Sequence, residues 1–213
     1  FDYEIDKDNN IAKLTNYKGN QEEVLIPSSI SGYPIKEIKD SMFEGNTTLQ
    51  SLIIAEGIEV IGDNAFKGCS SLKQIKVEGL DTNNAYGEIY FPNSLKTIGK
   101  NAFEGCITLR RIHFNNVSLV KEKAFADCIN LKVVEFGNAE SRLEKAAFIN
   151  CNNIAFFKTP MHEESANIMV KNGYLYFDPD RKLSKEDLLG YFVGLLSSNY
   201  YSYNNGRADF NNK

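Results

Sequence analysis

The stretch KNAFEGCITLRRIHF, residues 100–114, contains the pattern that decides the fold. Four variants of it occur elsewhere, each built around a Phe: DSMFEGNTTLQSLII (40–54), DNAFKGCSSLKQIKV (63–77), EKAFADCINLKVVEF (122–136) and KAAFINCNNIAFFKT (145–159). The period is 22 or 23 residues, except that 37 residues separate Phe66 from Phe103. Tandem copies at this spacing predict a solenoid, because stacked repeats share a core that one repeat cannot bury alone.

Apolar residues recur at fixed distances from each Phe. In the central copy Leu109, Ile112 and Phe114 stand six, nine and eleven residues after it, and Thr159 is the one break in these columns. The last two positions alternate as in a strand, so we expect a parallel ladder with strands ~4.8 Å apart. A further apolar column lies five residues before each Phe. The Ile-Gly-x-x-Ala-Phe part between is too short for a free helix and is expected to form a tight turn or a single helical turn.

Three segments fall outside the regular repeats. The long interval contains an extra 14 residues, which we place around GLDTNNAYG (79–87) because this stretch is rich in turn formers. Residues 1–27 are expected to form a hairpin-like cap that merges into the first repeat. The solenoid should then cover residues 1–160. Residues 161–213 should form a C-terminal capping segment, with a hairpin around Asn172-Gly173, an amphipathic helix at about 185–197 and a loose tail.

The repeat resembles a known class of leucine-rich repeat. The combination of C/N-x-x-L-x-x-I-x-L with I-G-x-x-A-F is similar to the repeats found in Treponema and in the BspA surface proteins. The segment IAKLTNYKGNQEEVLIPSSISGYPIKEI (11–38) adds the Tyr-x-Gly, Ile-Pro and Gly-x-Pro of that family. The resemblance covers roughly residues 3–160. It implies an α/β, β-rich fold: a right-handed leucine-rich repeat solenoid with a parallel strand ladder, short helical turns and a C-terminal helical cap.

The same resemblance implies a function in binding. It suggests an extracellular or cell-surface protein without enzymatic activity that mediates protein–protein or matrix adhesion. Two alternatives stay open: a rigid structural spacer with no ligand of its own, and an intracellular interaction scaffold. The chain begins at Phe1 without Met, so we expect a processed or trimmed form whose targeting signal has been removed. The sequence leaves the oligomeric state open.

Composition narrows the functional classes. With a net charge of −4, 42% hydrophobic and 24% charged residues, the chain has the balance of a soluble folded protein and not of a nucleic-acid binder. No apolar run approaches the ~18 residues of a membrane span. There are only two histidines, and the phosphate-loop, nucleophile-elbow and HExxH motifs are missing from the sequence. We therefore predict no catalytic activity, no cofactor and no metal site.

The four cysteines share one column of the repeat. Cys69, Cys106, Cys128 and Cys151 each stand three residues after a Phe, where the first copy has Asn46. A small polar group in this column can turn inward and bond to the backbone of the bend, which predicts buried, reduced thiols. Parallel side chains in a column have poor disulfide geometry, and they cannot surround zinc tetrahedrally. The string Asp6–Asn10 lacks the Gly and Glu of a calcium loop and is expected to be a hairpin turn.

Positive charge gathers at the outward positions of the expected ladder. Residues eight and ten after each Phe should face solvent on a concave sheet, and residue seven adds further charges at the beginning of each strand. The candidate ligand-binding residues on this face are Lys73, Gln74, Lys76, Arg110, Arg111, His113, Lys132 and Glu135. We expect the basic ones within two or three neighbouring strands, where they could bind an anionic partner: an acidic protein segment, or a sulfated or uronic-acid matrix glycan. The alternative is an ordinary solvated face.

Overall fold

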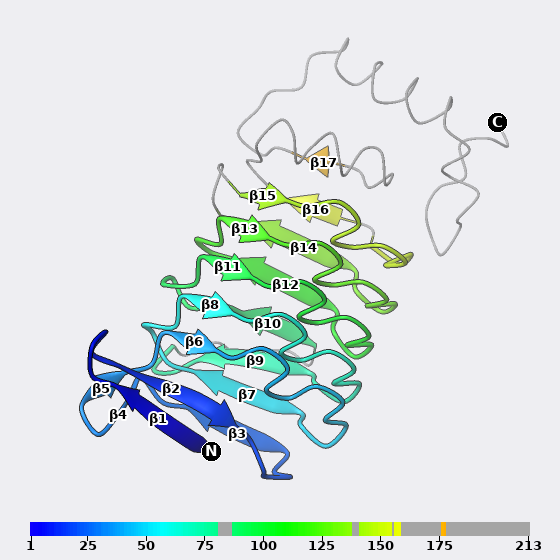
Figure 1. Cartoon of the computed structure of the whole chain (residues 1–213). Coiled ribbons are helices and arrows are strands. Elements are labelled where there is room, and N and C mark those ends of the chain that lie inside the picture. The colour runs from blue at the N-terminus through cyan, green and yellow to red at the C-terminus, as the bar shows by residue number, and fades with distance from the viewer. Residues whose placement is uncertain (81–86, 138–140, 155, 159–175, 178–213) are drawn as a thin grey trace, which may run out of the picture.

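The apolar positions nine and eleven residues after each Phe lie on parallel strands, which together form one side of the molecule. The computed structural model describes residues 1–80, 87–137, 141–154, 156–158 and 176–177. One sheet, here called the main ladder, contains in spatial order β3 (Glu23–Ile26), β7 (Ser51–Ile54), β9 (Gln74–Val77), β10 (Glu88–Tyr90), β12 (Arg111–Phe114), β14 (Val133–Phe136), β16 (Phe156–Lys158) and β17 (Tyr176–Phe177). All neighbours in it are parallel (Figure 1). The predicted parallel ladder is therefore confirmed.

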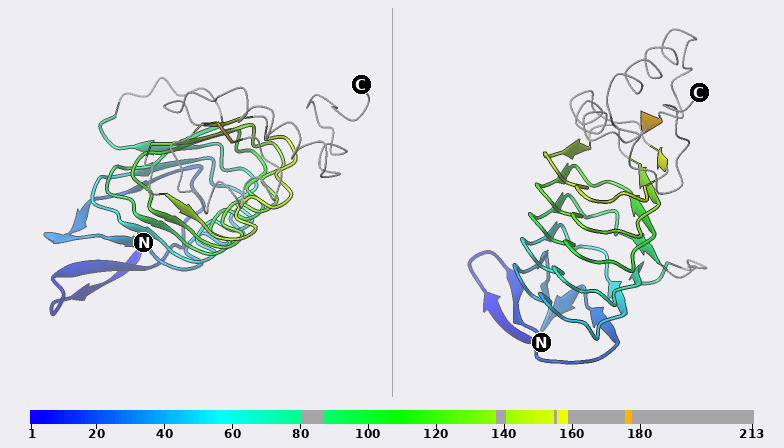
Figure 2. Two further views of the ribbon diagram at one scale, coloured as in Figure 1. Left: turned by 90° about the horizontal axis from the view of Figure 1, so that it is seen from above. Right: turned by 90° about the vertical axis from the view of Figure 1, so that its right-hand side faces the viewer.

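A second parallel ladder runs along another side of the solenoid. It contains β6 (Glu37–Ile38), β8 (Val60–Ile61), β11 (Thr97–Ile98), β13 (Leu119–Val120) and β15 (Arg142–Leu143) (Figure 2). The second residue of each of these strands belongs to the apolar column five residues before Phe and is buried. The column is visible in the sequence, but the strands are not predicted from it, since two residues are too few to show an alternation.

The bends that carry the Phe residues are turns. No helix occurs among the residues that the structure describes, so the short helical turns are not found there. Left-handed backbone explains this: Asn101 has φ 53° and Gly105 has φ 74°, and the same two positions have positive φ in every copy. Two such residues within five interrupt any right-handed helix. The expected helix at 185–197, the tail and residues 168–175 of the expected C-terminal hairpin lie outside the described residues.

The backbones of successive bends are bonded to each other. The amide of Phe66 donates to the carbonyl of Ala102 at 2.7 Å, and the amide of Phe103 donates to the carbonyl of Ala124 at 2.7 Å. These bonds satisfy peptide groups that the missing helix would otherwise have paired. Each turn of the solenoid is thus hydrogen-bonded to the next on three sides.

Stacked rings and a thiol column fill the core. Ring centroids of successive Phe residues lie 5.1, 5.0, 5.0 and 5.3 Å apart from Phe43 to Phe148, with interplanar angles of 4–10°. All four cysteines are free and buried. Each thiol donates to the carbonyl of the Phe in the preceding copy; the Cys69 Sγ, for example, lies 3.0 Å from the oxygen of Phe43. The prediction of buried, reduced thiols is confirmed.

The N-terminal cap is an antiparallel hairpin of β1 (Asp2–Asp6) and β2 (Ile11–Asn16), which confirms the expected turn at Asp6–Asn10. Ala12 and Leu14 of β2 are buried in the core. Beyond β2, the Tyr17 ring lies 4.8 Å from Phe43, tilted by 45°, and so covers the end of the ring stack. A smaller hairpin, β4 (Ser29–Ile30) with β5 (Tyr33–Pro34), follows before β6 begins.

The long interval between Phe66 and Phe103 adds one strand to the main ladder. Strand β10 lies between β9 and β12, with Ile89 in register with both Ile75 and Ile112. On the second ladder β8 pairs directly with β11, so the insertion has no counterpart there. At this level the main ladder is longer than the opposite side by one strand spacing, ~4.8 Å. This works against the concavity that a leucine-rich repeat implies for the outward face of the main ladder.

Candidate recognition surface

The predicted binding residues all lie along the outward face of the main ladder or at its border. Gln74 and Lys76 are on β9, Arg111 and His113 on β12, and Glu135 on β14. The remaining three, Lys73, Arg110 and Lys132, immediately precede these strands. However, β10 separates β9 from β12, so the set spans four strands and Lys76 does not neighbour His113. The expectation of two or three neighbouring strands is corrected, because the insertion contains a strand.

Strand β10 brings two residues to this face that sequence analysis missed. Glu88 pairs with Arg111 in the ladder register, and Tyr90 pairs with His113. Both side chains are half-buried, while Ile89 between them is fully buried. The alternation Glu-Ile-Tyr was the available signal. It was overlooked because the insertion was interpreted from its turn-forming residues alone.

Five side chains form one bonded group, here called the central cluster: Glu88, Tyr90, Arg111, His113 and Glu135. Arg111 lies between the two carboxylates, with Nε 3.3 Å from Glu88 and Nη1 3.3 Å from Glu135. The Nδ1 of His113 is 2.8 Å from the other oxygen of Glu135. The Tyr90 ring stacks on His113 at 4.2 Å and 9°, and its hydroxyl donates to Glu88 at 3.1 Å. Each member therefore holds at least one other in place.

Burial makes this cluster less basic than its sequence suggests. It lowers the pKa of His113, and the opposing attraction of Glu135 does not restore it. The imidazole is thus neutral at pH 7, with Nδ1–H donating to Glu135. Its Nε2 is buried and has no hydrogen-bond partner among the described residues. Burial, followed by the nearby Glu88, also raises the pKa of Tyr90. With Arg111 compensated by two carboxylates, the centre of the face has little free positive charge.

The uncompensated cations lie around the cluster. Within the described part of the chain, Lys76, Arg110 and Lys132 form no ion pair with a carboxylate. The Nζ of Lys73 donates to the neutral amide oxygen of Gln50 at 2.8 Å. The positive charge expected from the sequence therefore lies beside the central cluster: Lys76 is on β9, and Arg110 and Lys132 are at the border of the face.

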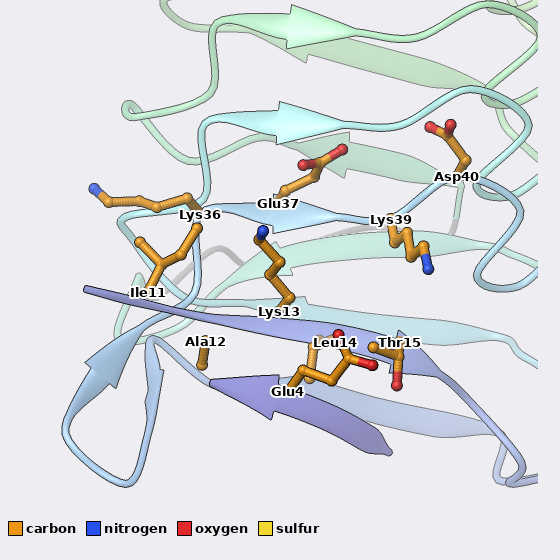
Figure 3. A pocket seen from close by; sticks show the side chains of 10 residues that line it. All are labelled: Glu4, Ile11, Ala12, Lys13, Leu14, Thr15, Lys36, Glu37, Lys39 and Asp40. Carbon is orange, nitrogen blue, oxygen red and sulfur yellow. The ribbon is translucent and has the colours of Figure 1, made fainter. Parts of the chain in front are cut away.

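The cap contributes a separate cleft of about 330 Å³ between β2 and β6 (Figure 3). Its charged lining residues are Glu4, Lys13, Lys36, Glu37, Lys39 and Asp40. The Nζ of Lys13 is bonded to Asp6 at 2.6 Å, and that of Lys36 to Glu59 at 2.7 Å. Burial and Asp40 raise the pKa of Glu37. Opposite charges are balanced in this cleft, and two of its three lysines are already paired, so it is a weaker candidate than the main ladder.

The thiols are not placed for catalysis. Cys106 is fully buried and its Sγ donates to the carbonyl of Phe66 at 3.2 Å, whereas His113 lies on the outward face of β12. Burial raises the pKa of Cys69 to about 12 and that of Cys106 well above its ordinary value. A thiol must lose its proton to act as a nucleophile. No group of three potential metal ligands occurs among the described residues.

These features define a repeat protein of the leucine-rich solenoid class with a polar, pre-bonded face and a closed core. A sequence profile for the BspA type leucine rich repeat region (6 copies) matches residues 16–86 and 81–169. The chain belongs to this family, whose members are generally scaffolds for binding and not enzymes.

Solved structures agree with this fold. The chain is similar to a leucine-rich repeat protein of Treponema pallidum, with 24% identity over 82% of this chain and 94% of that one and a TM-score of 0.58. It is also similar to the pneumococcal vaccine antigen PcpA, with 23% identity, a TM-score of 0.51, and coverage of 68% of this chain and 32% of that one. No curated protein sequence matches the chain significantly. In the described part of the chain, no helix is long and apolar enough to cross a membrane.

Proposed function

We propose that this chain is a recognition module of the cell surface or extracellular space that binds a partner protein through the outward face of its main ladder. The observation that carries the proposal is the central cluster, in which Tyr90, Arg111 and His113 are held by contacts within the face. The location rests on the surface proteins whose repeats the chain resembles and on its likeness to PcpA, a vaccine antigen. Binding of this kind serves adhesion to other proteins or to matrix.

The cluster has properties that suit an interface. Tyr and Arg are enriched among residues that contribute most to binding energy. Side chains already fixed by stacking and ion pairs lose little conformational entropy when a partner docks. Half-exposed ion pairs of this kind contribute only about 0–1 kcal/mol to folding. The fold has little need of this arrangement, since the buried columns on the other side of each strand stabilise it.

The test is a binding screen of the whole chain against extracellular matrix proteins, matrix glycans and proteins of neighbouring cells. The double variant Tyr90→Ala, Arg111→Ala should bind the partner found at least ~30-fold more weakly, as expected when two central residues are removed. Thr97→Ala, on the second ladder, is the matched control and should bind as the parent does. Equal binding by all three proteins would place the interface elsewhere, and a chain that binds nothing would be a structural spacer.

A further inference from the structure

Three cations stand in one row along the border of the main ladder. Lys73, Arg110 and Lys132, here called the basic rim, each directly precede a strand. The amide of Lys132 donates to the carbonyl of Arg110 at 2.8 Å, so these two residues are direct neighbours on adjacent strands. Gly87 occupies the same row before β10, and its carbonyl accepts the amide of Arg110 at 2.8 Å. Neighbouring positions in the row are therefore about 4.8 Å apart.

Gly87 lets the rim close over the inserted strand. A Cβ on this residue would lie 2.8–2.9 Å from three carbons of the Arg110 side chain, which is too close for any real contact. The stem of Arg110 therefore lies across the space above Gly87. Gly87 stands between Lys73 and Arg110 in the row but has no side chain, and the side chain of Arg110 occupies the space that one would fill.

The charges of Arg110 and Lys132 are available, unlike that of Arg111 in the central cluster. Arg110 and Lys132 are exposed and form no ion pair with a carboxylate of the described chain. The two acids of the central cluster, Glu88 and Glu135, are already bonded within it. An exposed cation without a partner gains most from an anion brought by another molecule.

Two exposed aliphatic side chains accompany these cations. Ile107 and Ile129 are 38% and 46% exposed, and they precede Arg110 and Lys132 by three residues. The side-chain amide of Asn130 donates to the carbonyl of Ile107 at 2.8 Å, which ties the two bends together. Two adjacent repeats thus present the same pair, an aliphatic side chain followed by a cation.

We infer that this edge binds an acidic segment of a partner protein, one that carries aliphatic residues among its carboxylates. The inference rests on the proposed function and names the chemistry of the partner at the border of that face. Sulfated glycans offer nothing to Ile107 and Ile129. The chain's net charge of −4 opposes the approach of a dense polyanion or an anionic membrane, but a short acidic segment meets only the local charge of the rim.

The test uses the full chain to select binders from a displayed library of random 12-residue peptides. Enriched peptides should combine Asp or Glu with Ile, Leu or Val. Reversing the rim with Arg110→Glu, Lys132→Glu should weaken their binding about tenfold or more, since each reversed charge removes an attraction and adds a repulsion. Ile107→Ser, Ile129→Ser should also weaken it. The charge-matched control, Lys96→Glu, Lys145→Glu, should bind as the parent does.

Three results would overturn the inference. Enriched peptides that lose binding with the central Tyr90→Ala, Arg111→Ala variant but tolerate the reversed rim would leave the proposed face in place and refute the rim. Peptides insensitive to both variants, or no enrichment, would count against both proposals. Retention on heparin, or on vesicles containing 30% phosphatidylserine, that is lost in the reversed-rim variant while no acidic peptide is enriched would assign the rim to a polyanion.

Discussion

Replacing Lys123 by Asn should stabilise the fold, although the side chain is exposed and lies outside the core. Lys123 has a left-handed backbone with φ 57°, as do Asn64 and Asn101 at the same position of earlier copies. In those copies the side chains are linked, since Nδ2 of Asn101 donates to Oδ1 of Asn64 at 3.1 Å. The Oδ1 of Asn101 is buried and has no partner among the described residues. An Asn at position 123 would offer it the same amide bond.

The expected gain has two parts. Asn tolerates the left-handed region better than Lys does, which is worth about 0.5–1 kcal/mol. A hydrogen bond to a buried acceptor that now lacks one adds about 1 kcal/mol. Loss of one exposed charge changes stability by no more than about 0.5 kcal/mol. The free energy of unfolding should rise by about 1–2 kcal/mol, which corresponds to a few degrees in Tm for a chain of this size.

Urea and thermal unfolding of three variants separate the two parts. Lys123→Gly removes the dihedral cost but supplies no amide, and it loses more backbone entropy on folding. Ala146→Asn, at φ 58° in the last copy, relieves only the dihedral cost because its neighbour in the column is Lys123. Lys123→Asn should be the most stable of the three. If it is no more stable than Lys123→Gly, the link to Asn101 does not form and the reasoning fails.

Three other perturbations probe the core and the face. Burial raises the pKa of Cys69 to about 12 and shields all four thiols, so iodoacetamide at pH 8 should label them only after unfolding. Rapid labelling of the folded chain would contradict the buried column of thiols. Phe103→Ala should lower the free energy of unfolding by about 3–5 kcal/mol in urea titrations, because the Phe103 ring lies 5.0 Å from a stacked ring on each side. A decrease below about 1 kcal/mol would be inconsistent with the stack of rings. Burial keeps the pKa of His113 in the folded chain below its ordinary 6.5, so on acidification the imidazole is protonated in the unfolded chain at a higher pH than in the folded one. The free energy of unfolding should therefore fall as the pH drops from about 6.5 toward the lowered pKa. His113→Gln should lose this part of the pH dependence, and an unchanged profile would show that the imidazole is not buried in solution.

The repeat and its core could be derived from the sequence because each copy restates the same constraint. The column containing Leu109 accepts only apolar residues, and the column containing Cys106 accepts only small polar ones. Because five copies repeat both columns in register, the repeat is identified without ambiguity. The bends were harder to predict. Their left-handed positions are filled by residues as different as Asn101, Lys123 and Ala146, so no residue type marks the conformation that excludes a helix.

The candidate site could be predicted only in part. Outward positions follow from strand periodicity, and all eight residues lie on or beside the outward face of the main ladder. The sequence does not show which of their charges are neutralised by ion pairs. Arg111 pairs with Glu135 and also with Glu88, and Glu88 belongs to the strand that the insertion adds. An inserted strand shifts every later repeat by one place in the ladder. The long interval between Phe66 and Phe103 shows that residues are inserted there, but not that three of them form a strand.

The insertion leaves the stack of Phe rings in the bends unbroken, and this explains how the face can differ from the rest of the solenoid. Phe66 and Phe103 are 37 residues apart in sequence, yet their rings lie 5.0 Å apart, the same distance as for Phe103 and Phe125, which are separated by 22. A parallel ladder grows by backbone hydrogen bonds, which accept a strand of almost any composition. The extra strand therefore fits without separating the stacked rings, and Ile89 and Phe91 join the core beside them. On the outward face it adds Glu88 and Tyr90, at positions that are free of the requirement to repeat that constrains every buried column.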